Sequence, residues 1–284
     1  RYCKCDCIIG IGGGSPLDAA KAIAVLAVND ISDNQLVNLE FQTALPIAAV
    51  PTTAGTGSEV TPASILTSPE VESKINVSSP LIIPRLAFLD PGYTIDLPWD
   101  STVDTAVDAF AHVLEGYLAK RANPLTDIIA QNTLAILGPK LKEMADEHNL
   151  TLEDREALLY ASLLAGMVIS HTGTSIPHAL GYSLTYFKGV PHGRATGMFL
   201  PAFMDFNLSH SDVSKIKSVI KISGFSSWAE FKKVLQQLLG RAPEITQMEK
   251  GKYIEICMAQ KAKSVANNLV TADKNDLLNI INSL

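Results

Sequence analysis

Four side chains in this sequence could together bind a divalent metal ion. Asp108 and His112 lie four residues apart in a stretch with helical spacing, so both should point from the same face of one helix. His178 opens a second apolar helical stretch, and His192 is expected in a loop between a proline and a glycine. One carboxylate and three imidazoles form a ligand set suited to a transition metal.

Each of these side chains also has an ordinary structural explanation when it is taken alone. Asp108 and His112 could form a pair on a helix surface, and such pairs contribute only about 0.2–0.5 kcal/mol. His178 could cap or pack, and His192 could be a simple loop residue. The combination favours a metal site, because it gathers three of the six histidines of the chain.

Other polar residues near this set have weaker roles. Glu115, which follows His112 on the same stretch, is expected to accept a hydrogen bond from a ligand imidazole. His171 is a weak candidate for an extra ligand, because Gly173 and Pro177 interrupt the helical spacing between it and His178. The remaining histidines, at positions 148 and 210, lie in polar contexts typical of the surface.

The segment Ile9–Asp18 is rich in glycine, follows an apparent strand and opens a helix. Ser15 is well placed as the N-cap, Pro16 as the first helical residue and Asp18 as the reciprocal capping residue. Exposed amides and the positive end of the helix dipole would suit a pyrophosphate. The motif departs from the G-x-G-x-x-G dinucleotide fingerprint, so a structural turn is the alternative.

A second loop, at residues 51–59, is rich in threonine and glycine and also follows an apparent strand. Its hydroxyl groups could hydrogen-bond phosphate, ribose or an amide, or could simply cap a turn. A ligand role gains weight because two such loops end neighbouring strands, where ligands bind in open α/β sheets. Lys74 is expected on a strand, where a lone lysine is usually an exposed edge residue.

The elements around these motifs predict an α/β part followed by a helical part. Strand, helix and strand in the first third imply a largely parallel sheet, and after Leu97 the pattern is mostly helical. We therefore predict two domains, 1–97 and 98–284, the first a partial dinucleotide-binding α/β domain and the second an all-α domain. The expected strands are 7–11, 46–50, 64–67, 74–77 and 86–89, and the expected helices are 16–28, 102–119, 124–146, 152–171, 177–187, 196–206, 211–222, 227–239, 249–266 and 274–283.

Composition excludes several classes of function. A net charge of −6 argues against a nucleic-acid or anionic-membrane surface, and no apolar stretch reaches the roughly 18 residues needed to span a bilayer. Cys3, Cys5 and Cys7 alternate along an apparent strand and are expected to be buried thiols, with a metal-binding C-x-C-x-C as the alternative. Free thiols and the absence of a signal segment favour the cytoplasm.

In its motifs the chain resembles the iron-containing (group III) alcohol dehydrogenases. The matching motifs occur in the family's order and extend over nearly the whole chain, at residues 12–24, 51–62, 108–117, 177–181 and 191–193. The resemblance implies a catalytic divalent metal, typically ferrous iron with Zn²⁺ as the alternative, held by Asp108, His112, His178 and His192. It also implies NAD or NADP bound along Gly13, Gly14, Ser15, Thr52, Thr53 and Thr56, with Lys74 near the ribose and Asp18 beside the nicotinamide end.

The chain departs from the family pattern at two points. The family has an additional N-terminal part that reads the adenosine ribose, so we expect that sequence is missing before Arg1. Many members also carry a histidine four residues after the equivalent of His178, often assigned to proton relay. Tyr182 stands there in this chain, and tyrosine, with a pKa of about 10, is a poorer relay at neutral pH.

The resemblance implies an oxidoreductase that transfers a hydride between a primary alcohol, or the aldehyde in reverse, and NAD(P). We expect a small-molecule substrate, no nucleic-acid or membrane partner, and a homo-oligomer, in particular a dimer. Two alternatives are a metal-dependent lyase of the dehydroquinate-synthase type and a truncated remnant that binds metal without catalysis. The lyase chemistry would need several basic residues, whereas mostly apolar and small residues surround the metal motifs, with Arg194 as the main exception.

Overall fold

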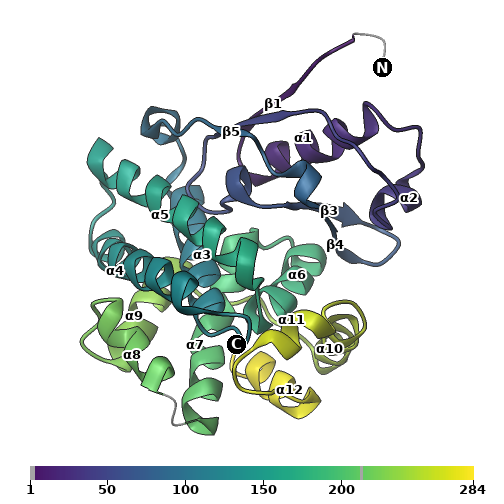
Figure 1. The fold of residues 1–284 in the computed structure, drawn as a ribbon. Coiled ribbons are helices and arrows are strands. Elements are labelled where there is room, and N and C mark those ends of the chain that lie inside the picture. Colours follow the sequence, from purple (N-terminus) through teal and green to yellow (C-terminus); the bar gives the residue numbers. More distant parts are fainter. Residues whose placement is uncertain (1–3, 212–213) are drawn as a thin grey trace.

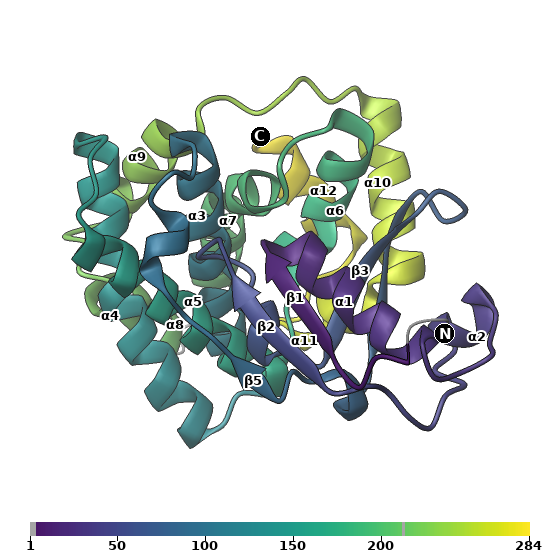
Figure 2. The same cartoon turned by 90° about the horizontal axis from the view of Figure 1, so that it is seen from above.

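The computed structural model describes residues 4–211 and 214–284. It has a small α/β part followed by a larger helical part, as the sequence predicts (Figure 1). Helix α1 (Gly14–Leu26) joins the first two strands of a parallel sheet and packs against both (Figure 2). The strand order of that sheet is β1 (Ile8–Gly12), β2 (Ile47–Pro51), β5 (Leu86–Ala87).

The two predicted ligand loops start at the same edge of this sheet. β1 and β2 pair in register from Ile8 opposite Ile47 to Gly12 opposite Pro51, so both strands end at the same level. The amide of Thr52 then donates to the carbonyl oxygen of Gly12 across 2.9 Å. Ligands bind at this carboxyl edge in open parallel sheets, so the register itself brings the two loops to one place.

Helix α1 is buried on the side that faces the sheet. Leu17, Ala20 and Ala24 recur at intervals of three and four residues and are at most 5% exposed, which is the pattern of an amphipathic helix. Ala24 joins a small core under the sheet that includes Val25 of the same helix and Ile47 of β2. One charged residue, Lys21, lies within this buried side of the helix.

The other two predicted strands of this part form a separate hairpin. β3 (Ala63–Ser68) and β4 (Ser73–Ser78) pair antiparallel, so the prediction of a largely parallel sheet is wrong for this pair. The physical reason is the short connection at 69–72, since a crossover to a parallel strand needs about a dozen residues or more. A short helix, α2 (Asp33–Val37), was not predicted, although Ser32 and Gln35 form its capping box.

The helical part is arranged around α3, which is buried at almost every position after Ser101. Helices α4, α5, α6 and α7 all pack against it. Three single-turn 3₁₀ helices, η1 (Ser58–Val60), η2 (Pro80–Ile82) and η3 (Pro91–Thr94), precede it. The helices are α3 (Trp99–Tyr117), α4 (Pro124–Asp146), α5 (Leu152–Thr172), α6 (Ile176–Lys188), α7 (His192–His210), α8 (Ser214–Ile222), α9 (Trp228–Leu239), α10 (Gln247–Gln260), α11 (Ala262–Asn267) and α12 (Lys274–Asn282).

Capping residues explain why several of these helices begin where the sequence predicts. Asn123 and Thr151 both form capping boxes, at the starts of α4 and α5. Two predictions need correction. The helix expected at 249–266 is two helices separated at Lys261, and the helix expected at 196–206 already begins at His192. The predicted domain limit near residue 97 lies between η3 and α3, where strands give way to helices.

The cysteines near the N-terminus are placed differently from the prediction. Cys5 and Cys7 are exposed and precede β1, so they are not buried thiols of a strand, and Cys3 lies outside the described residues. No single helix among the described residues is both long and apolar enough to cross a bilayer. Helices α5 and α6 pass that test of length and composition only jointly, across a bend of 109°.

Candidate active site

Helix α3 carries three ionisable side chains into the centre of the helical part. Asp108, His112 and Glu115 are four and three residues apart, so they lie along one side of the helix. Their exposed fractions are 2%, 6% and 0%. Burying such groups is costly unless each has a hydrogen bond or an opposite charge beside it, so their partners decide what the site can bind.

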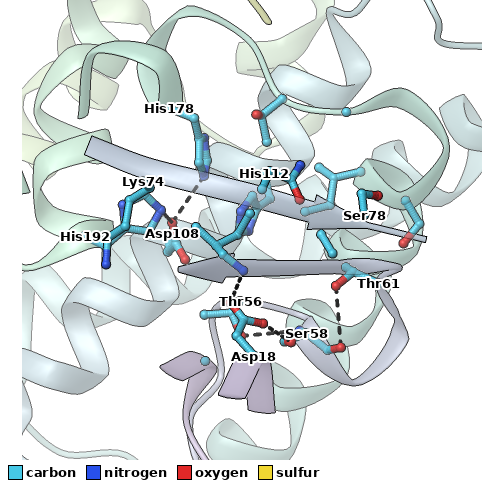
Figure 3. A pocket seen from close by; sticks show the side chains of 18 of the residues that line it. Asp18, Thr56, Ser58, Thr61, Lys74, Ser78, Asp108, His112, His178 and His192 are labelled. Atoms are coloured by element: carbon cyan, nitrogen blue, oxygen red, sulfur yellow. Dashed lines mark hydrogen bonds and ion pairs between the residues drawn. The ribbon is translucent and has the colours of Figure 1, made fainter. Parts of the chain in front are cut away.

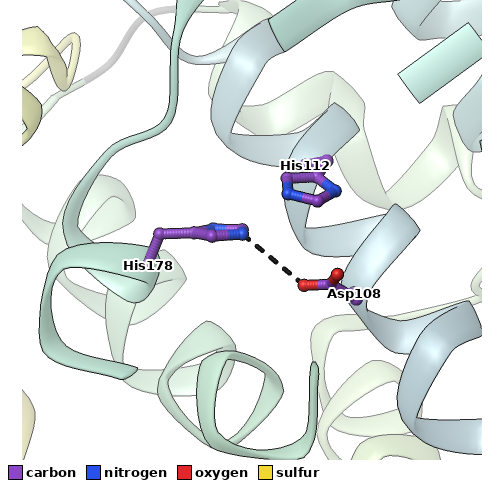
Figure 4. A group of neighbouring side chains, drawn as sticks. All are labelled: Asp108, His112 and His178. Atoms are coloured by element: carbon purple, nitrogen blue, oxygen red, sulfur yellow. Dashed lines mark ion pairs between the residues drawn. The ribbon is translucent and has the colours of Figure 1, made fainter. Parts of the chain in front are cut away.

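His178 of α6 completes a compact cluster with Asp108 and His112 (Figure 4). Each of the three residues offers a ligand atom, and these atoms lie within 4.8 Å of one another. The Nε2 atom of His178 is 3.5 Å from Oδ1 of Asp108, and the rings of His112 and His178 stack with centroids 4.4 Å apart. A carboxylate oxygen and two imidazole nitrogens this close could surround one cation.

The second nitrogen of each imidazole is held by a hydrogen bond. Nδ1 of His112 donates to the carbonyl oxygen of Gly55 across 3.2 Å, and Nδ1 of His178 donates to Oε1 of Glu115 across 2.5 Å. The other Glu115 oxygen accepts from the amide of Ser175 at 2.6 Å. The contact expected for Glu115 is therefore present. In both rings Nε2 is left free to bind a cation, as is usual for metal-binding histidines.

Two buried carboxylates require positive charge at this point. Burial opposes ionisation of Asp108, but the imidazoles of His112, His192 and His178 outweigh it and lower the pKa of this carboxyl. Burial also favours a neutral His178, but Glu115 and Asp108 outweigh it and raise the pKa of that imidazole to about 10. Either a proton on His178 or a metal ion can supply the positive charge.

Two atoms at the centre of the cluster have no hydrogen-bond partner within the described part of the chain. They are Oδ1 of Asp108 and Nε2 of His178, and both are buried. Such atoms are rare in folded proteins, because each costs about 1–3 kcal/mol. Both belong to the compact cluster, where a bound cation would satisfy them. The donor set therefore fits a divalent metal ion.

His192 is the first residue of α7, so the prediction that it lies in a loop is wrong. The first turn of α7 packs so closely on α3 that a Cβ at Gly193 would lie 1.9 Å from the carbonyl oxygen of Asp104. This approach brings Nε2 of His192 within 3.9 Å of Oδ1 of Asp108, while the side chain stays 31% exposed. Partial burial lowers the pKa of His192 to about 4, although Asp108 opposes this. A neutral imidazole thus stands beside the compact cluster of three.

A cavity of about 450 Å³ joins this cluster to the two loops that follow β1 and β2 (Figure 3). A volume of this size is typical of ligand pockets. All four metal-competent residues line it, together with the predicted cofactor residues Gly14, Ser15, Asp18, Thr56 and Lys74. Three further predicted cofactor residues, Gly13, Thr52 and Thr53, lie in the same loops without lining the cavity.

The glycine-rich loop enters α1 earlier than predicted. Gly13 is the N-cap and no side chain caps the helix, so the capping roles expected for Ser15 and Asp18 are wrong, and Pro16 is the third helical residue. Asp18 instead accepts a hydrogen bond from Oγ of Ser58 at 2.7 Å and one from a backbone amide of β3 at 2.9 Å. The first amides of α1 therefore have no side-chain partner and suit an anionic ligand.

The two loops pack directly on each other. A Cβ at Gly14 would lie 2.7 Å from Cγ2 of Thr56, and one at Gly13 would lie 3.1 Å from Cγ2 of Thr53. Because both glycines leave this space open, the loops together form a single wall of the cavity. Lys74 reaches the cavity from β4, with its Nζ donating to Oγ1 of Thr67 at 2.7 Å.

Tyr182 lies flat against His192. The two ring centroids are 5.1 Å apart and the ring planes differ by 6°. Nζ of Lys261 lies over the Tyr182 ring, 4.7 Å from its centroid. Burial raises the pKa of Tyr182, and Asp108 reinforces this. The phenol therefore stays neutral over the physiological range.

Sequence reasoning missed three residues next to the site. Ser58 lines the cavity and Lys21 lies behind it, hydrogen-bonded to Ser58. The three-residue spacing of Asp18 and Lys21 on one helix was the available signal for this pair. Lys261 was also missed. Its Nζ donates to the carbonyl oxygen of Lys74 at 2.7 Å, and local sequence patterns do not predict a contact between such distant segments.

Comparison with known proteins gives matches over nearly the entire chain. A family model described as iron-containing alcohol dehydrogenase matches residues 1–91, and one for the C-terminal part of the Fe-containing alcohol dehydrogenase family matches residues 102–283. Among curated proteins, a probable alcohol dehydrogenase, EutG, from Escherichia coli (strain K12) is 38% identical over 212 residues, which is 73% of this chain and 53% of that protein. The chain thus spans about half the length of the curated relatives it matches.

Solved structures share the fold as well. An iron-containing alcohol dehydrogenase from Thermotoga maritima superposes with a TM-score of 0.87 at 40% identity, covering 97% of this chain and 74% of that one. A sulfoacetaldehyde reductase from Bifidobacterium kashiwanohense, solved in complex with NAD⁺, gives a TM-score of 0.87 at 27% identity, covering 100% of this chain and 77% of that one.

Proposed function

This chain belongs to the family of iron-containing alcohol dehydrogenases, and on that premise we propose that it is a metal-dependent oxidoreductase. The reaction is hydride transfer between a primary alcohol, or the aldehyde in reverse, and NAD(P). Its substrate is a small molecule that fits beside the cofactor in a cavity of about 450 Å³.

One observation carries this proposal. The unpartnered buried atoms of Asp108 and His178 line the same cavity as the start of α1. A site for a cation and a site for a pyrophosphate therefore open into one space. An alcohol dehydrogenase needs this combination, because the alcohol oxygen and the nicotinamide must meet.

The metal would be held by Asp108, His112, His178 and His192. When bound, it supplies a Lewis acid that stabilises an alkoxide near neutral pH or polarises an aldehyde carbonyl. Glu115 orients His178, and the Gly55 carbonyl orients His112. One carboxylate with three imidazoles binds both Fe²⁺ and Zn²⁺, and zinc more tightly, so the ion present depends on supply.

The cofactor would lie along the wall made by the two loops. Gly13, Gly14 and Ser15 would offer their amides to its pyrophosphate, with Thr52, Thr53 and Thr56 opposite them. Lys74 would reach the ribose. This assignment is supported by the close packing of the two loops and by the cavity lining on both sides.

Two further residues would act near the reacting atoms. Asp18, whose carboxylate is fixed by Ser58 and by an amide of β3, would hold the nicotinamide end in place. Tyr182 would relay a proton through its hydroxyl group, which stays neutral because burial raises its pKa. Its flat contact with His192 places it beside the proposed metal ligands.

The cavity offers little support for the lyase alternative. Among the described residues that line it, Lys74 and Arg121 are the only lysine and arginine. A phosphorylated, carboxylated substrate would need more basic residues.

We also propose a homodimer, which light scattering on the purified protein would test. The exposed thiols of Cys5 and Cys7 support the cytoplasm as the proposed location.

The proposed function is tested by purifying the protein without oxygen, loading Fe²⁺ or Zn²⁺ and following NADH and NADPH oxidation with a series of short aldehydes. We expect aldehyde-dependent oxidation that a chelator abolishes. Metal binding without turnover, together with no heat of NADH binding in calorimetry, would instead support a non-catalytic metal-binding remnant.

A further inference from the structure

Lys21 of α1 is a buried lysine that the chemistry described so far does not use. Its exposed fraction is 0%, and burial lowers its pKa to about 8, against the opposing effect of Asp18 and Glu59. It is not among the described residues that line the cavity. A buried ammonium group is costly unless its donors are occupied, so its contacts indicate what the protein gains from it.

All three donors of the Lys21 ammonium group are occupied, and every acceptor belongs to the segment after β2. Nζ donates to Oγ of Ser58 at 2.8 Å, to Oγ1 of Thr61 at 3.0 Å and to the carbonyl oxygen of Ala63 at 2.7 Å. A protonated lysine has three donors and no acceptor, so this site matches the charged form. One side chain of α1 thus fixes the second ligand loop at its far end.

The same contacts extend to Asp18. Ser58 accepts a hydrogen bond from Lys21, so its hydroxyl proton is free to point at Oδ1 of Asp18, 2.7 Å away. Nζ of Lys21 is itself 3.9 Å from that oxygen. Asp18, Ser58 and Thr61 all line the cavity (Figure 3). Lys21 therefore sets the direction of a hydrogen-bond chain that ends at the cavity wall.

Glu59 adds a reason for the positive charge. Its carboxylate is 2% exposed, and Oε1 has no hydrogen-bond partner among the described residues. Lys21 lowers the pKa of Glu59, although burial has the larger effect and raises it. Without Lys21, the carboxylates of Asp18 and Glu59 and the hydroxyl groups of Ser58 and Thr61 would lose a cation that they share.

We propose that Lys21 is a positioning residue for the nicotinamide cofactor, because its charge holds Ser58 of the second loop, Thr61 just after that loop and the Asp18 carboxylate in the geometry to which the cofactor binds. This inference rests on the proposed function. It assigns to Lys21 an effect on cofactor affinity that is separate from metal binding, since no ligand of the proposed metal site contacts it.

The charged groups around Lys21 give this role a pH signature. Asp18 of its own helix and Glu59 of η1 act on it. Strands β1, β2 and β3 carry no ionisable side chain, Lys74 of β4 acts on Asp18, and Asp33 of α2 is exposed. Loss of the Lys21 proton would remove one of three hydrogen-bond donors, so NADH affinity should fall as pH rises through about 8.

The test compares Lys21→Met with Val25→Ala in the metal-loaded protein. Val25 is 0% exposed on the same helix and packs in the small core under the sheet, so its truncation loosens α1 without removing a loop contact. Calorimetry should show NADH binding weakened about tenfold or more in Lys21→Met, the loss of a hydrogen bond to a charged group, with unchanged metal content. Val25→Ala should lower Tm and leave the NADH dissociation constant unchanged.

Wild-type affinity in Lys21→Met, or an equal loss in Val25→Ala, would overturn the inference. Ser58→Ala and the double variant add a check, because two residues that act through one contact should not have additive effects on affinity; additive effects would count against the mechanism. If Lys21→Met does not fold, the wild-type protein still tests the proposed role of Lys21. An NADH affinity that stays constant from pH 7 to 9 would contradict that role. A wild-type protein that binds no NADH defeats the proposed function itself.

Discussion

The Glu115 carboxylate and the His178 imidazole are joined by a 2.5 Å hydrogen bond inside the helical part, where neither side chain is more than 2% exposed. This contact fixes which nitrogen of His178 faces Asp108. It also adds a second buried negative charge next to the cluster of Asp108, His112 and His178. The preference of this site for a cation thus depends on a residue that is not itself a proposed ligand.

Replacing Glu115 by Gln should weaken metal binding by about 10- to 100-fold, the usual range for partners of ligand histidines. The amide keeps the shape but removes the charge that makes the imidazole a better donor. A competition titration against a chelator measures the change. Glu153→Gln, at an exposed position in the first turn of α5, is the control, and an affinity in Glu115→Gln equal to that control would refute the role.

Gly193→Ala should displace the start of α7. The added Cβ would meet the carbonyl oxygen of Asp104 at 1.9 Å, and such overpacking costs about 1–3 kcal/mol or more. We expect a lower free energy of unfolding by denaturant and weaker metal binding, because His192 moves with the helix. Gly251→Ala in α10 is the matched control. A Cβ there meets nothing within 4 Å, so that variant should gain up to about 1 kcal/mol.

The stability of the folded protein should rise with pH between about 8 and 10.5 through Lys21. Burial lowers its pKa from 10.5 to about 8, so in this window the unfolded chain holds a proton that the folded chain has released. Stability rises with pH wherever the unfolded state binds more protons. Denaturant titrations should show this slope in the wild-type protein and a smaller one in Lys21→Met, up to about 3 kcal/mol over the window. Equal slopes would show that Lys21 is not titrating as described.

Tyr182→His should add an acidic limb to the pH–rate profile near about 6.5, the ordinary pKa of histidine. In the native protein burial raises the pKa of the phenol, so no such limb is expected from that position. Tyr182→Phe keeps the ring against His192 and removes only the hydroxyl group, and it should lower kcat while metal content stays at the wild-type level. A wild-type kcat in Tyr182→Phe would remove this residue from the proton path.

Local sequence signals predicted most of the helical part. The capping boxes at Asn123 and Thr151 are complete within four residues, so the starts of α4 and α5 follow from sequence. The i, i+4 spacing of Asp108 and His112 likewise placed both side chains on one side of α3, whatever the tertiary context. These features depend on neighbours along the chain alone.

What the sequence did not reveal depends on contacts between distant segments. Ser15 has the residue type of an N-cap, but the loop begins its helix at Gly14 because the glycines pack on Thr53 and Thr56. His192 belongs to a helix because Gly193 fits against α3. The burial of Lys21 could not be predicted for the same reason. A lysine in an amphipathic helix is normally solvated, and the acceptors of Lys21 lie in the segment after β2.

In the proposed site, Asp108, His112 and His178, with His192 beside them, would hold one divalent metal ion in the cavity that would also bind the cofactor. Elemental analysis of the protein purified without oxygen measures this for the wild type, His178→Ala and the exposed-histidine control His171→Ala. We predict about one equivalent of iron or zinc in the wild type and in His171→Ala, since the proposed ligands surround a single ion. His178→Ala should retain almost none, and a full equivalent of metal in that variant would rule out the proposed site.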